Sequence, residues 1–193
     1  MTVIQTKPFY LMRHGETVAN VEGYVAGQID TPLTQKGREQ AKRTQSILTS
    51  LSLKPKLIVH SNLSRSRDTA AIINESFRLP MREQASIAER NLGDWAKISL
   101  KEWFRRWNEG LQPPNGETSD AFKERVMIGI AEALILSKSP VLIVTHAGVL
   151  RTFMSHYGFK ADYADNCALF SFTPNNQESA LPWKIEHIIP AGP

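Results

Sequence analysis

The chain has 193 residues, of which 41% are apolar and 22% charged, and its formal net charge is +4 at pH 7. This composition predicts one globular domain, residues 1–193, that can bury a substantial core. The sequence has no Lys/Arg-rich tract, no zinc-ligand pattern, and no apolar run near the roughly 20 residues of a membrane helix. We therefore expect neither nucleic acid nor a membrane as a partner.

Cys167 is the only cysteine, which excludes an intrachain disulfide. A chain without disulfides fits a reducing compartment, and the first residues lack the pattern of a secretion signal. We therefore expect a cytoplasmic protein. The sequence leaves the oligomeric state open, with a homodimer as one option.

The first predicted strand ends in reactive side chains. Residues 9–12 form a short apolar run, and Gly15 breaks it directly after Arg13 and His14. A strand that stops there places both polar side chains at the carboxyl edge of a sheet, where open α/β sheets bind their ligands. An arginine beside a histidine at that edge indicates an anion that one residue holds and the other attacks.

Strands alternate with helices along the rest of the chain. Apolar runs predict further strands at 57–59, 141–145, 168–173 and 183–189. Apolar spacing and capping residues predict helices at 34–51, 64–77, 99–108, 118–137 and 147–156. We expect 15–33 to be a loop and 79–98 to be irregular with one short strand. This order predicts an α/β fold with a mostly parallel sheet and helices on both faces.

Polar residues that suit phosphate chemistry follow three of these strands. Arg13 and His14 follow the first, Arg65 comes after the second, and His146 follows the strand at 141–145. If the strands are neighbours, these side chains share one pocket. Arginine forks bind phosphate oxygens, and an imidazole that nearby positive charge keeps neutral can attack phosphorus.

Metal binding is the alternative for paired histidines. The sequence contains no His-Glu-x-x-His, no cluster of cysteines and histidines, and no aspartate at the strand ends. We therefore expect a site without a metal and without a cofactor.

Four blocks of residues occur along nearly the whole chain. They are Arg13-His14-Gly15-Glu16-Thr17 with Asn20, Gly27, residues 30–34 and Gly37; Ser61 to Ala70; Glu89 with Gly93 and Trp95; and Thr145-His146-Ala147-Gly148. Together they resemble the signature of the histidine phosphatase superfamily, also called phosphoglycerate-mutase-like, in its usual order. The resemblance implies the three-layer sandwich of that family.

The resemblance also implies a role for each site residue. His14 would be the nucleophile that becomes phosphohistidine, and Arg13, Arg65 and His146 would bind the phosphoryl oxygens. Glu89 would protonate the leaving oxygen and then activate water. The remaining phosphate-binding positions would be Asn20, Ala26, Gly27, Ala147 and Arg67, with a helix surface as the alternative for Arg67. After Glu89 the chain reads Trp95-Ala96-Lys97, where many members have Trp-Glu-Gly, so this loop is expected to be atypical.

The family contains phosphatases and sugar-phosphate mutases. Residues 90–145 form a short interval between the acid and the second histidine, whereas cofactor-dependent mutases carry an insertion there. This favours a metal-independent hydrolase of a small phosphorylated metabolite, and residues 113–118 resemble a stretch of the small phosphatases similar to α-ribazole phosphatase. A phosphoglycerate mutase and a non-catalytic binder of phosphorylated ligands are the alternatives.

Residues 95–117 are the predicted specificity segment, or lid. It could offer aromatic walls and positive charge to the substrate, or its aromatic residues could pack the lid onto the body while its cations are solvated. The residues concerned are Trp95, Trp103, Phe104, Trp107, Lys101, Arg105 and Arg106. His60, His156 and His187 match no block, and we expect them to be structural or surface residues.

Overall fold

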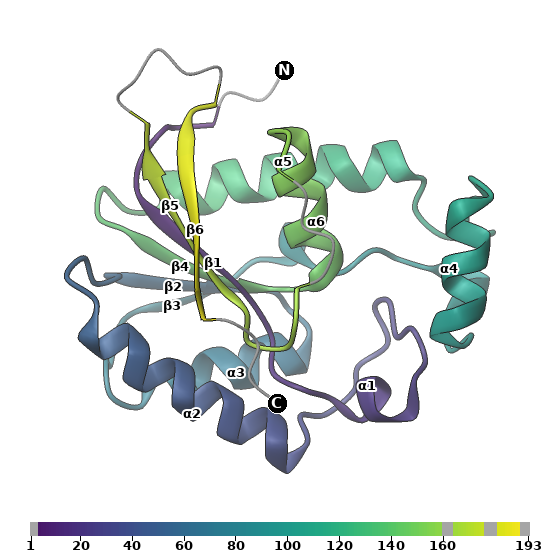
Figure 1. The fold of residues 1–193 in the computed structure, drawn as a ribbon, viewed down its shortest axis with the longest axis horizontal. Helices are drawn as coiled ribbons and strands as arrows, with labels where there is room; N and C mark the ends of the chain where they lie inside the picture. The colour runs from purple at the N-terminus through teal and green to yellow at the C-terminus, as the bar shows by residue number, and fades with distance from the viewer. Residues whose placement is uncertain (1–3, 160–163, 176–180, 190–193) are drawn as a thin grey trace.

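A six-stranded sheet forms the middle layer of the protein (Figure 1). The computed structural model describes residues 4–159, 164–175 and 181–189. The strands are β1 (Phe9–Arg13), β2 (Leu57–His60), β3 (Met81–Glu83), β4 (Val141–Thr145), β5 (Leu169–Pro174) and β6 (Trp183–Ile189). They lie in the order β3-β2-β4-β1-β5-β6, and the first four are parallel, whereas β5 and β6 pair antiparallel. The predicted mostly parallel sheet is confirmed.

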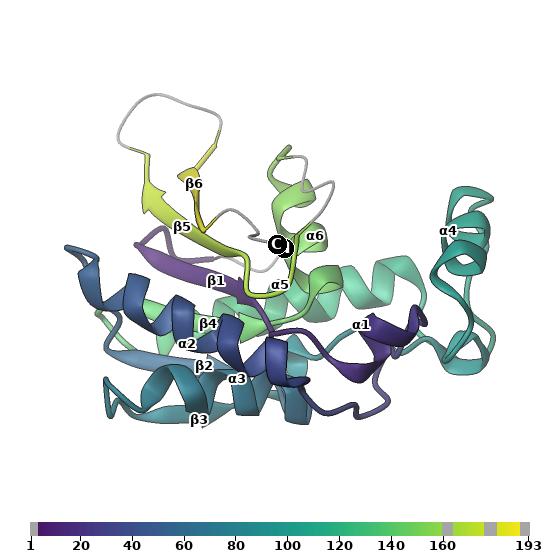
Figure 2. The same cartoon turned by 60° about the horizontal axis from the view of Figure 1, so that its bottom comes forward.

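Helices cover both faces of this sheet (Figure 2). The two on one face are α2 (Gln35–Ser50) and α3 (Ser64–Asn74), and the two on the other are α5 (Ser119–Ile135) and α6 (Ala147–His156). Helix plus sheet plus helix gives the predicted α/β sandwich of three layers.

Strand β1 shows how two cores form, one on each side of the sheet. Phe9 and Leu11 point into the core shared with α5 and α6, and Tyr10 and Met12 point into the core shared with α2 and α3. All four are at most 5% exposed. Because successive side chains of a strand alternate between its faces, a strand buried on both faces must be apolar throughout. This is the physical reason why residues 9–12 read as an uninterrupted apolar run.

The structure differs from the predicted elements at a few places. The expected loop at 15–33 contains a short helix, α1 (Val18–Glu22), whose capping box is closed by Thr17 and Asn20 instead of a glutamate or glutamine. Helix α3 ends at Asn74, because the Asn74 side chain binds the backbone of Leu79. The irregular segment at 79–98 contains β3 and two short 3-10 turns.

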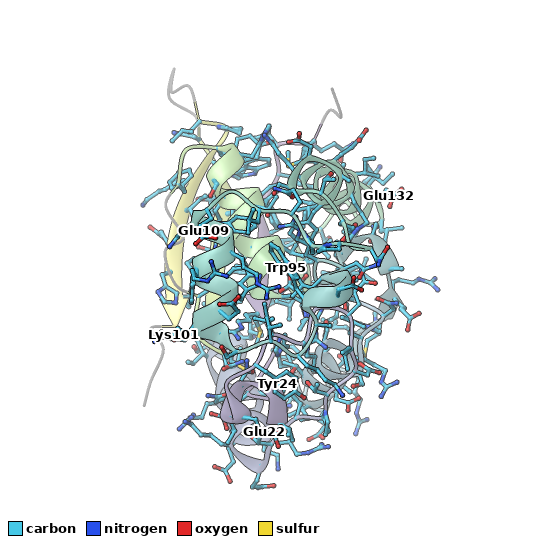
Figure 3. The ribbon with its side chains drawn as sticks, turned by 90° about the vertical axis from the view of Figure 1, so that its right-hand side faces the viewer. Glu22, Tyr24, Trp95, Lys101, Glu109 and Glu132 are labelled. Carbon is cyan, nitrogen blue, oxygen red and sulfur yellow. The ribbon has the colours of Figure 1, made fainter. Side chains whose placement is uncertain are left out.

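Helices α1 and α4 (Leu100–Asn108) lie beyond the carboxyl ends of the parallel strands (Figures 1 and 3). The N-cap of α4 is Ser99, as predicted, and its side chain accepts the Glu102 N–H. The Glu102 side chain does not complete a capping box with Ser99, because its carboxylate pairs with Arg105 and Arg106 instead. Within the described residues, no helix combines the length and the apolar character that a membrane span requires.

Candidate active site

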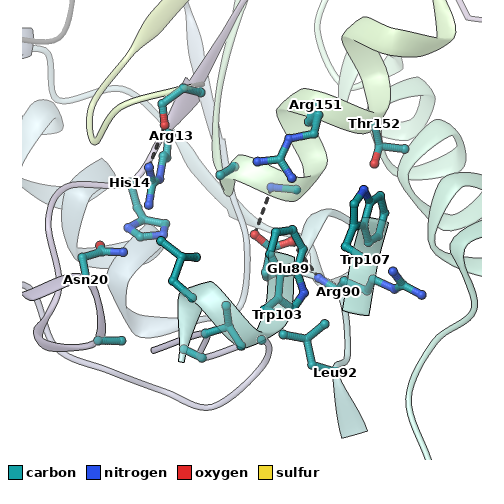
Figure 4. A pocket seen from close by; sticks show the side chains of 18 of the residues that line it. Arg13, His14, Asn20, Glu89, Arg90, Leu92, Trp103, Trp107, Arg151 and Thr152 are labelled. Atoms are coloured by element: carbon teal, nitrogen blue, oxygen red, sulfur yellow. Dashed lines mark hydrogen bonds between the residues drawn. The ribbon is translucent and has the colours of Figure 1, made fainter. Parts of the chain in front are cut away.

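The carboxyl ends of β1 and β4 open into a cavity of about 570 Å³ (Figure 4). In the parallel pair β1–β4, Arg13 lies opposite Thr145. The next residue on each strand is a histidine, so this register brings His14 and His146 together, with ring centroids 5.2 Å apart. Arg65 joins them from the first turn of α3, and Glu89 from the loop after β3. Arg13, His14, Arg65 and Glu89 line the cavity together, whereas His146 is fully buried beside His14 and does not line it.

His14 is buried, with 5% of its surface exposed. Its Nδ1 lies 2.7 Å from the Gly15 carbonyl oxygen, which can only accept, so Nδ1 carries the ring hydrogen and Nε2 keeps a lone pair. Burial, the Arg65 charge and the Arg13 charge hold the pKa of His14 well below its ordinary value, against the effect of the Gly15 hydrogen bond. His14 is therefore a neutral imidazole whose free nitrogen can act as a nucleophile.

Close backbone packing fixes the turn that carries His14. A Cβ on Gly15 would collide with the Gly37 carbonyl group, and a Cβ on Gly37 would collide with the backbone of Glu16. The Gly15 N–H donates to the Thr69 hydroxyl at 3.0 Å, and the Glu16 carboxylate accepts the Thr34 hydroxyl at 2.8 Å. The turn after β1 is thereby held against the first turn of α2, which explains why both glycines are needed.

Two arginines place positive charge beside His14. Arg65 is 3% exposed, and its guanidinium donates to the carbonyl oxygens of Gly27 at 2.7 Å and Ile29 at 3.0 Å. Gly27 has a φ of 54°, a left-handed conformation that suits glycine. Arg13 donates to the Ala164 carbonyl oxygen at 2.6 Å. Both arginines line the cavity, where their planar groups can bind oxyanions.

Glu89 lies across the cavity from His14 (Figure 4). One carboxylate oxygen accepts the Arg90 N–H at 2.9 Å and the other accepts the Gly148 N–H at 3.0 Å. Glu89 is only partly buried, so its carboxylate can reach a bound molecule. Two fixed donors and an open side suit a group that exchanges a proton with a ligand.

A salt bridge outside the cavity holds the loop that carries Glu89. Arg125 donates to the carbonyl oxygens of Ser86, Ala88 and Glu89, and it pairs with Glu117 at 2.6 Å. The Glu117 carboxylate also accepts the Asn91 N–H at 2.8 Å. The stretch at 113–118 therefore braces the loop of Glu89 from behind and does not line the cavity.

The structure brings most of the remaining predicted residues to the cavity. Asn20, Ala26, Gly27 and Ala147 all line it. The Asn20 amide oxygen accepts the Thr17 N–H and an N–H of Asn166, each at 3.1 Å. These residues surround the space beside Arg13 and His14.

Arg67 requires a correction, because the structure does not bring it to the cavity. It is exposed, and its guanidinium pairs with Asp68 at 2.9 Å. Arg67 follows Arg65 by two positions on α3. Side chains that are two positions apart in an α-helix point to nearly opposite sides of the helix. Since Arg65 points into the cavity, Arg67 faces solvent, which was the alternative considered for it.

The predicted lid contributes aromatic side chains to the far wall of the cavity, but not its cations. Trp103, Phe104 and Trp107 line the cavity from α4, and Trp95 is buried beneath them. Lys101 and Arg105 are exposed and do not line the cavity, and Arg105 pairs with Glu102 and Glu109. Arg106 pairs with Glu102 and lies over the Trp95 ring.

Positive charge at the far wall comes from elsewhere in the chain. The Arg151 guanidinium lies 5.8 Å from the Trp103 ring centroid, and the Arg90 guanidinium lies 5.3 Å from that of Trp107. Arg151 was missed by sequence reasoning. One signal could have found it, because Arg151 follows Ala147 by one helical turn and so shares its face of α6.

The other histidines differ in their surroundings. His156 is exposed, as expected for a surface residue, and it also lines the cavity. His60 is buried with Nδ1 2.9 Å from the Ser61 carbonyl oxygen, and His187 is exposed and stacked on Phe170. Among the residues that the structure describes, no three His, Cys, Asp or Glu side chains come close enough to hold a metal ion.

The chain is similar to proteins named as phosphatases and as probable phosphoglycerate mutases. Residues 9–180 match the model of the histidine phosphatase superfamily, branch 1. The chain is 33% identical to an adenosylcobalamin/α-ribazole phosphatase of Escherichia coli over 73% of this chain and 74% of that protein. It is also 34% identical to a probable phosphoglycerate mutase GpmB of Salmonella arizonae, over 76% of this chain and 72% of that protein. The solved structure of Bacillus stearothermophilus YhfR superimposes with a TM-score of 0.79 at 26% identity, over 95% of this chain and 100% of that one.

Proposed function

The chain belongs to the histidine phosphatase superfamily and is a phosphatase, and from this premise we propose that His14 is its nucleophile in a metal-independent hydrolysis of small phosphorylated metabolites. A phosphohistidine intermediate is typical of the family. The observation that carries the assignment is the neutral, buried imidazole of His14, whose Nδ1 binds the Gly15 carbonyl oxygen, which leaves Nε2 with a lone pair, close to the charges of Arg65 and Arg13.

The first half of the reaction forms the phosphoenzyme. Arg13, Arg65 and His146 bind the phosphoryl oxygens and stabilise the charge of the transition state. His14 Nε2 attacks phosphorus, a nitrogen–phosphorus bond forms, and the bond to the leaving oxygen breaks. Glu89 in its protonated form gives its proton to that oxygen, so the product leaves as a neutral alcohol.

The second half releases phosphate. The Glu89 carboxylate takes a proton from a water molecule as that water attacks phosphorus, and the nitrogen–phosphorus bond breaks. Inorganic phosphate leaves, His14 is neutral again, and Glu89 is protonated for the next cycle. Asn20, Ala26, Gly27 and Ala147 complete the phosphate pocket in this proposal.

The far wall supports a substrate whose leaving group has a planar or apolar body and oxygen atoms. Trp103, Phe104 and Trp107 supply apolar surface. The Arg151 guanidinium lies against the Trp103 ring and binds no hydrogen-bond acceptor among the described residues, so its donors are open to a ligand. We infer that residues 95–117 act with Arg151 as the specificity segment of a single domain that works in the cytoplasm.

A mutase is the second candidate, because relatives named as probable phosphoglycerate mutases match the chain. A mutase returns the phosphoryl group to its substrate, whereas a phosphatase gives it to water. Incubation with α-ribazole phosphate and with phosphoglycerates, followed by analysis of both free phosphate and isomerised product, separates the two.

The central experiment measures hydrolysis of p-nitrophenyl phosphate by the wild type and by His14→Ala. We expect the variant to lose activity, and acid quenching of the wild type should trap a phosphorylated His14. The matched control is His187→Ala, because His187 is exposed, stacked on Phe170 and outside the cavity. Activity that persists in His14→Ala would overturn the nucleophile, and loss of wild-type activity with a chelator would overturn metal independence.

A further inference from the structure

From the turn between β2 and α3, Ser61 contacts His146, the buried histidine that lies behind the cavity and beside His14. Its hydroxyl oxygen lies 2.7 Å from His146 Nε2. Both residues are fully buried. The mechanism above uses His146 but assigns nothing to Ser61.

The position of Ser61 is fixed by its backbone. Its N–H lies 3.2 Å from the Val144 carbonyl oxygen and 3.1 Å from the Ser66 hydroxyl oxygen. The Ser66 hydroxyl in turn donates to Val144 at 2.6 Å. The hydroxyl of Ser61 is therefore held at one place between β2 and β4, close to the start of α6.

The hydrogen of the Ser61 hydroxyl has one acceptor among these contacts. The Ser61 oxygen already accepts the Leu63 N–H at 3.1 Å, and its other close neighbour is His146 Nε2. If the hydroxyl donates to Nε2, that nitrogen carries a lone pair, and a neutral imidazole must then hold its hydrogen on Nδ1. Burial first, and then the charges of Arg65 and other neighbours, lower the pKa of His146 well below its ordinary value, so the ring is neutral.

His146 Nδ1 is buried and has no hydrogen-bond partner among the described residues. A buried N–H without an acceptor is unfavourable, so this atom needs a partner that the protein itself does not supply. The His14 ring lies beside it, and Arg65 and Arg13 are the charges that act most strongly on the pair. A phosphoryl group on His14 would bring an oxygen acceptor to this place.

We propose that Ser61 is a positioning residue, whose hydroxyl fixes His146 as the Nδ1–H tautomer so that Nδ1 donates to an oxygen of the transferring phosphoryl group. This inference rests on the proposed function, because it requires phosphate to bind between the two histidines. In the opposite tautomer, Nδ1 would present a lone pair to an anion, and that contact would be repulsive.

Nitrogen-15 NMR of the histidine rings tests the tautomer directly in the full-length wild type, with inorganic phosphate as the probe. We expect His146 to be protonated at Nδ1 and not at Nε2, and the Nδ1 signal to move when phosphate binds. A hydrogen on Nε2 would overturn the role of Ser61 while leaving a phosphate response at both histidines. If phosphate moves neither histidine, the phosphate site itself is wrong.

Variants test the consequence for turnover. Ser61→Ala should populate both tautomers and lower kcat by roughly tenfold, less than the roughly 100- to 1000-fold typical of deleting a charge-stabilising donor. Ser61→Thr keeps a hydroxyl and should restore the Nδ1–H signal. Ser171→Ala is the matched control, because Ser171 is a buried serine of β5 that does not line the cavity. An unchanged tautomer and kcat in Ser61→Ala would overturn the proposal, and if that variant does not fold, the wild-type spectrum decides.

Discussion

Glu89 lies directly against the backbone of Gly148, at the first turn of α6. The Gly148 N–H donates to the Glu89 carboxylate at 3.0 Å, and a Cβ on residue 148 would collide with the same carboxylate. The residue that would donate the proton is therefore held by the helix that begins after the second histidine. Because Glu89 and Gly148 come from different sequence blocks, this contact links the third block to the fourth.

Gly148→Ala should therefore lower kcat without lowering stability. The new methyl group displaces the Glu89 carboxylate, whereas alanine in a helix is favoured over glycine by up to about 1 kcal/mol. Steady-state kinetics and a thermal melt of the same preparation check this. A variant with full activity would show that the Glu89 carboxylate can move without consequence.

Glu89→Gln should lose activity in a way that depends on the leaving group. A glutamine cannot donate a proton, so kcat for an alkyl phosphate should fall by roughly 100- to 10000-fold, the usual contribution of acid–base catalysis. For p-nitrophenyl phosphate the rate of phosphoenzyme formation should fall much less, because its leaving group is stable without protonation. Burst kinetics separate that step from hydrolysis of the phosphoenzyme.

The matched control for Glu89 is Glu16→Gln, because Glu16 also lines the cavity but binds Thr34 and Lys36. Its substitution should change kcat by similar factors for both substrates. Equal losses in the rate of the burst phase for both leaving groups in Glu89→Gln would contradict its role as the acid.

Arg151→Met should raise KM for substrates with a polar leaving group. Methionine keeps apolar contact with Trp103 but removes the guanidinium donors, and a hydrogen bond to a charged group contributes about 1.5–3 kcal/mol, or roughly 10- to 100-fold in affinity. Hydrolysis of p-nitrophenyl phosphate should change less. Arg105→Met is the control, because Arg105 does not line the cavity and pairs with glutamates. A comparable effect of both substitutions would argue against the subsite.

Stability should fall as the pH drops below about 6.5, the ordinary pKa of histidine. Burial and then Arg65 lower the folded-state pKa of both His14 and His146, so below pH 6.5 the unfolded chain takes up protons that the folded chain does not. Each histidine then lowers the free energy of unfolding by up to about 1.4 kcal/mol per pH unit. Above pH 6.5 this loss is absent and the full stability is present. Urea unfolding between pH 5.5 and 7.5, in a buffer without phosphate, measures this slope.

The variant His14→Asn provides the control for this pH dependence. It removes one of the two histidines whose pKa lies well below the ordinary value, so the slope below pH 6.5 should decrease by about half. A slope that stays the same would assign the pH dependence to other groups.

Local patterns in the sequence determined much of this protein. The apolar run before Arg13 and His14 predicts a buried strand, and Thr34 and Thr118 are the N-caps of α2 and α5, at the start of the predicted helices. These features depend on neighbours within a few residues, so they can be read from the chain. The expectation that Arg13, His14, Arg65, Glu89 and His146 form the site also came from the sequence, through the resemblance of four blocks to one family.

Only the tertiary structure decided which further side chains reach the cavity. The register of β1 on β4 sets His14 beside His146, and the rotation of α3 turns Arg65 inward and Arg67 outward. Ser61 meets His146 and Arg151 meets Trp103 through packing between segments far apart in the chain. No short-range sequence pattern predicts such contacts, because they depend on how whole helices and strands pack against one another.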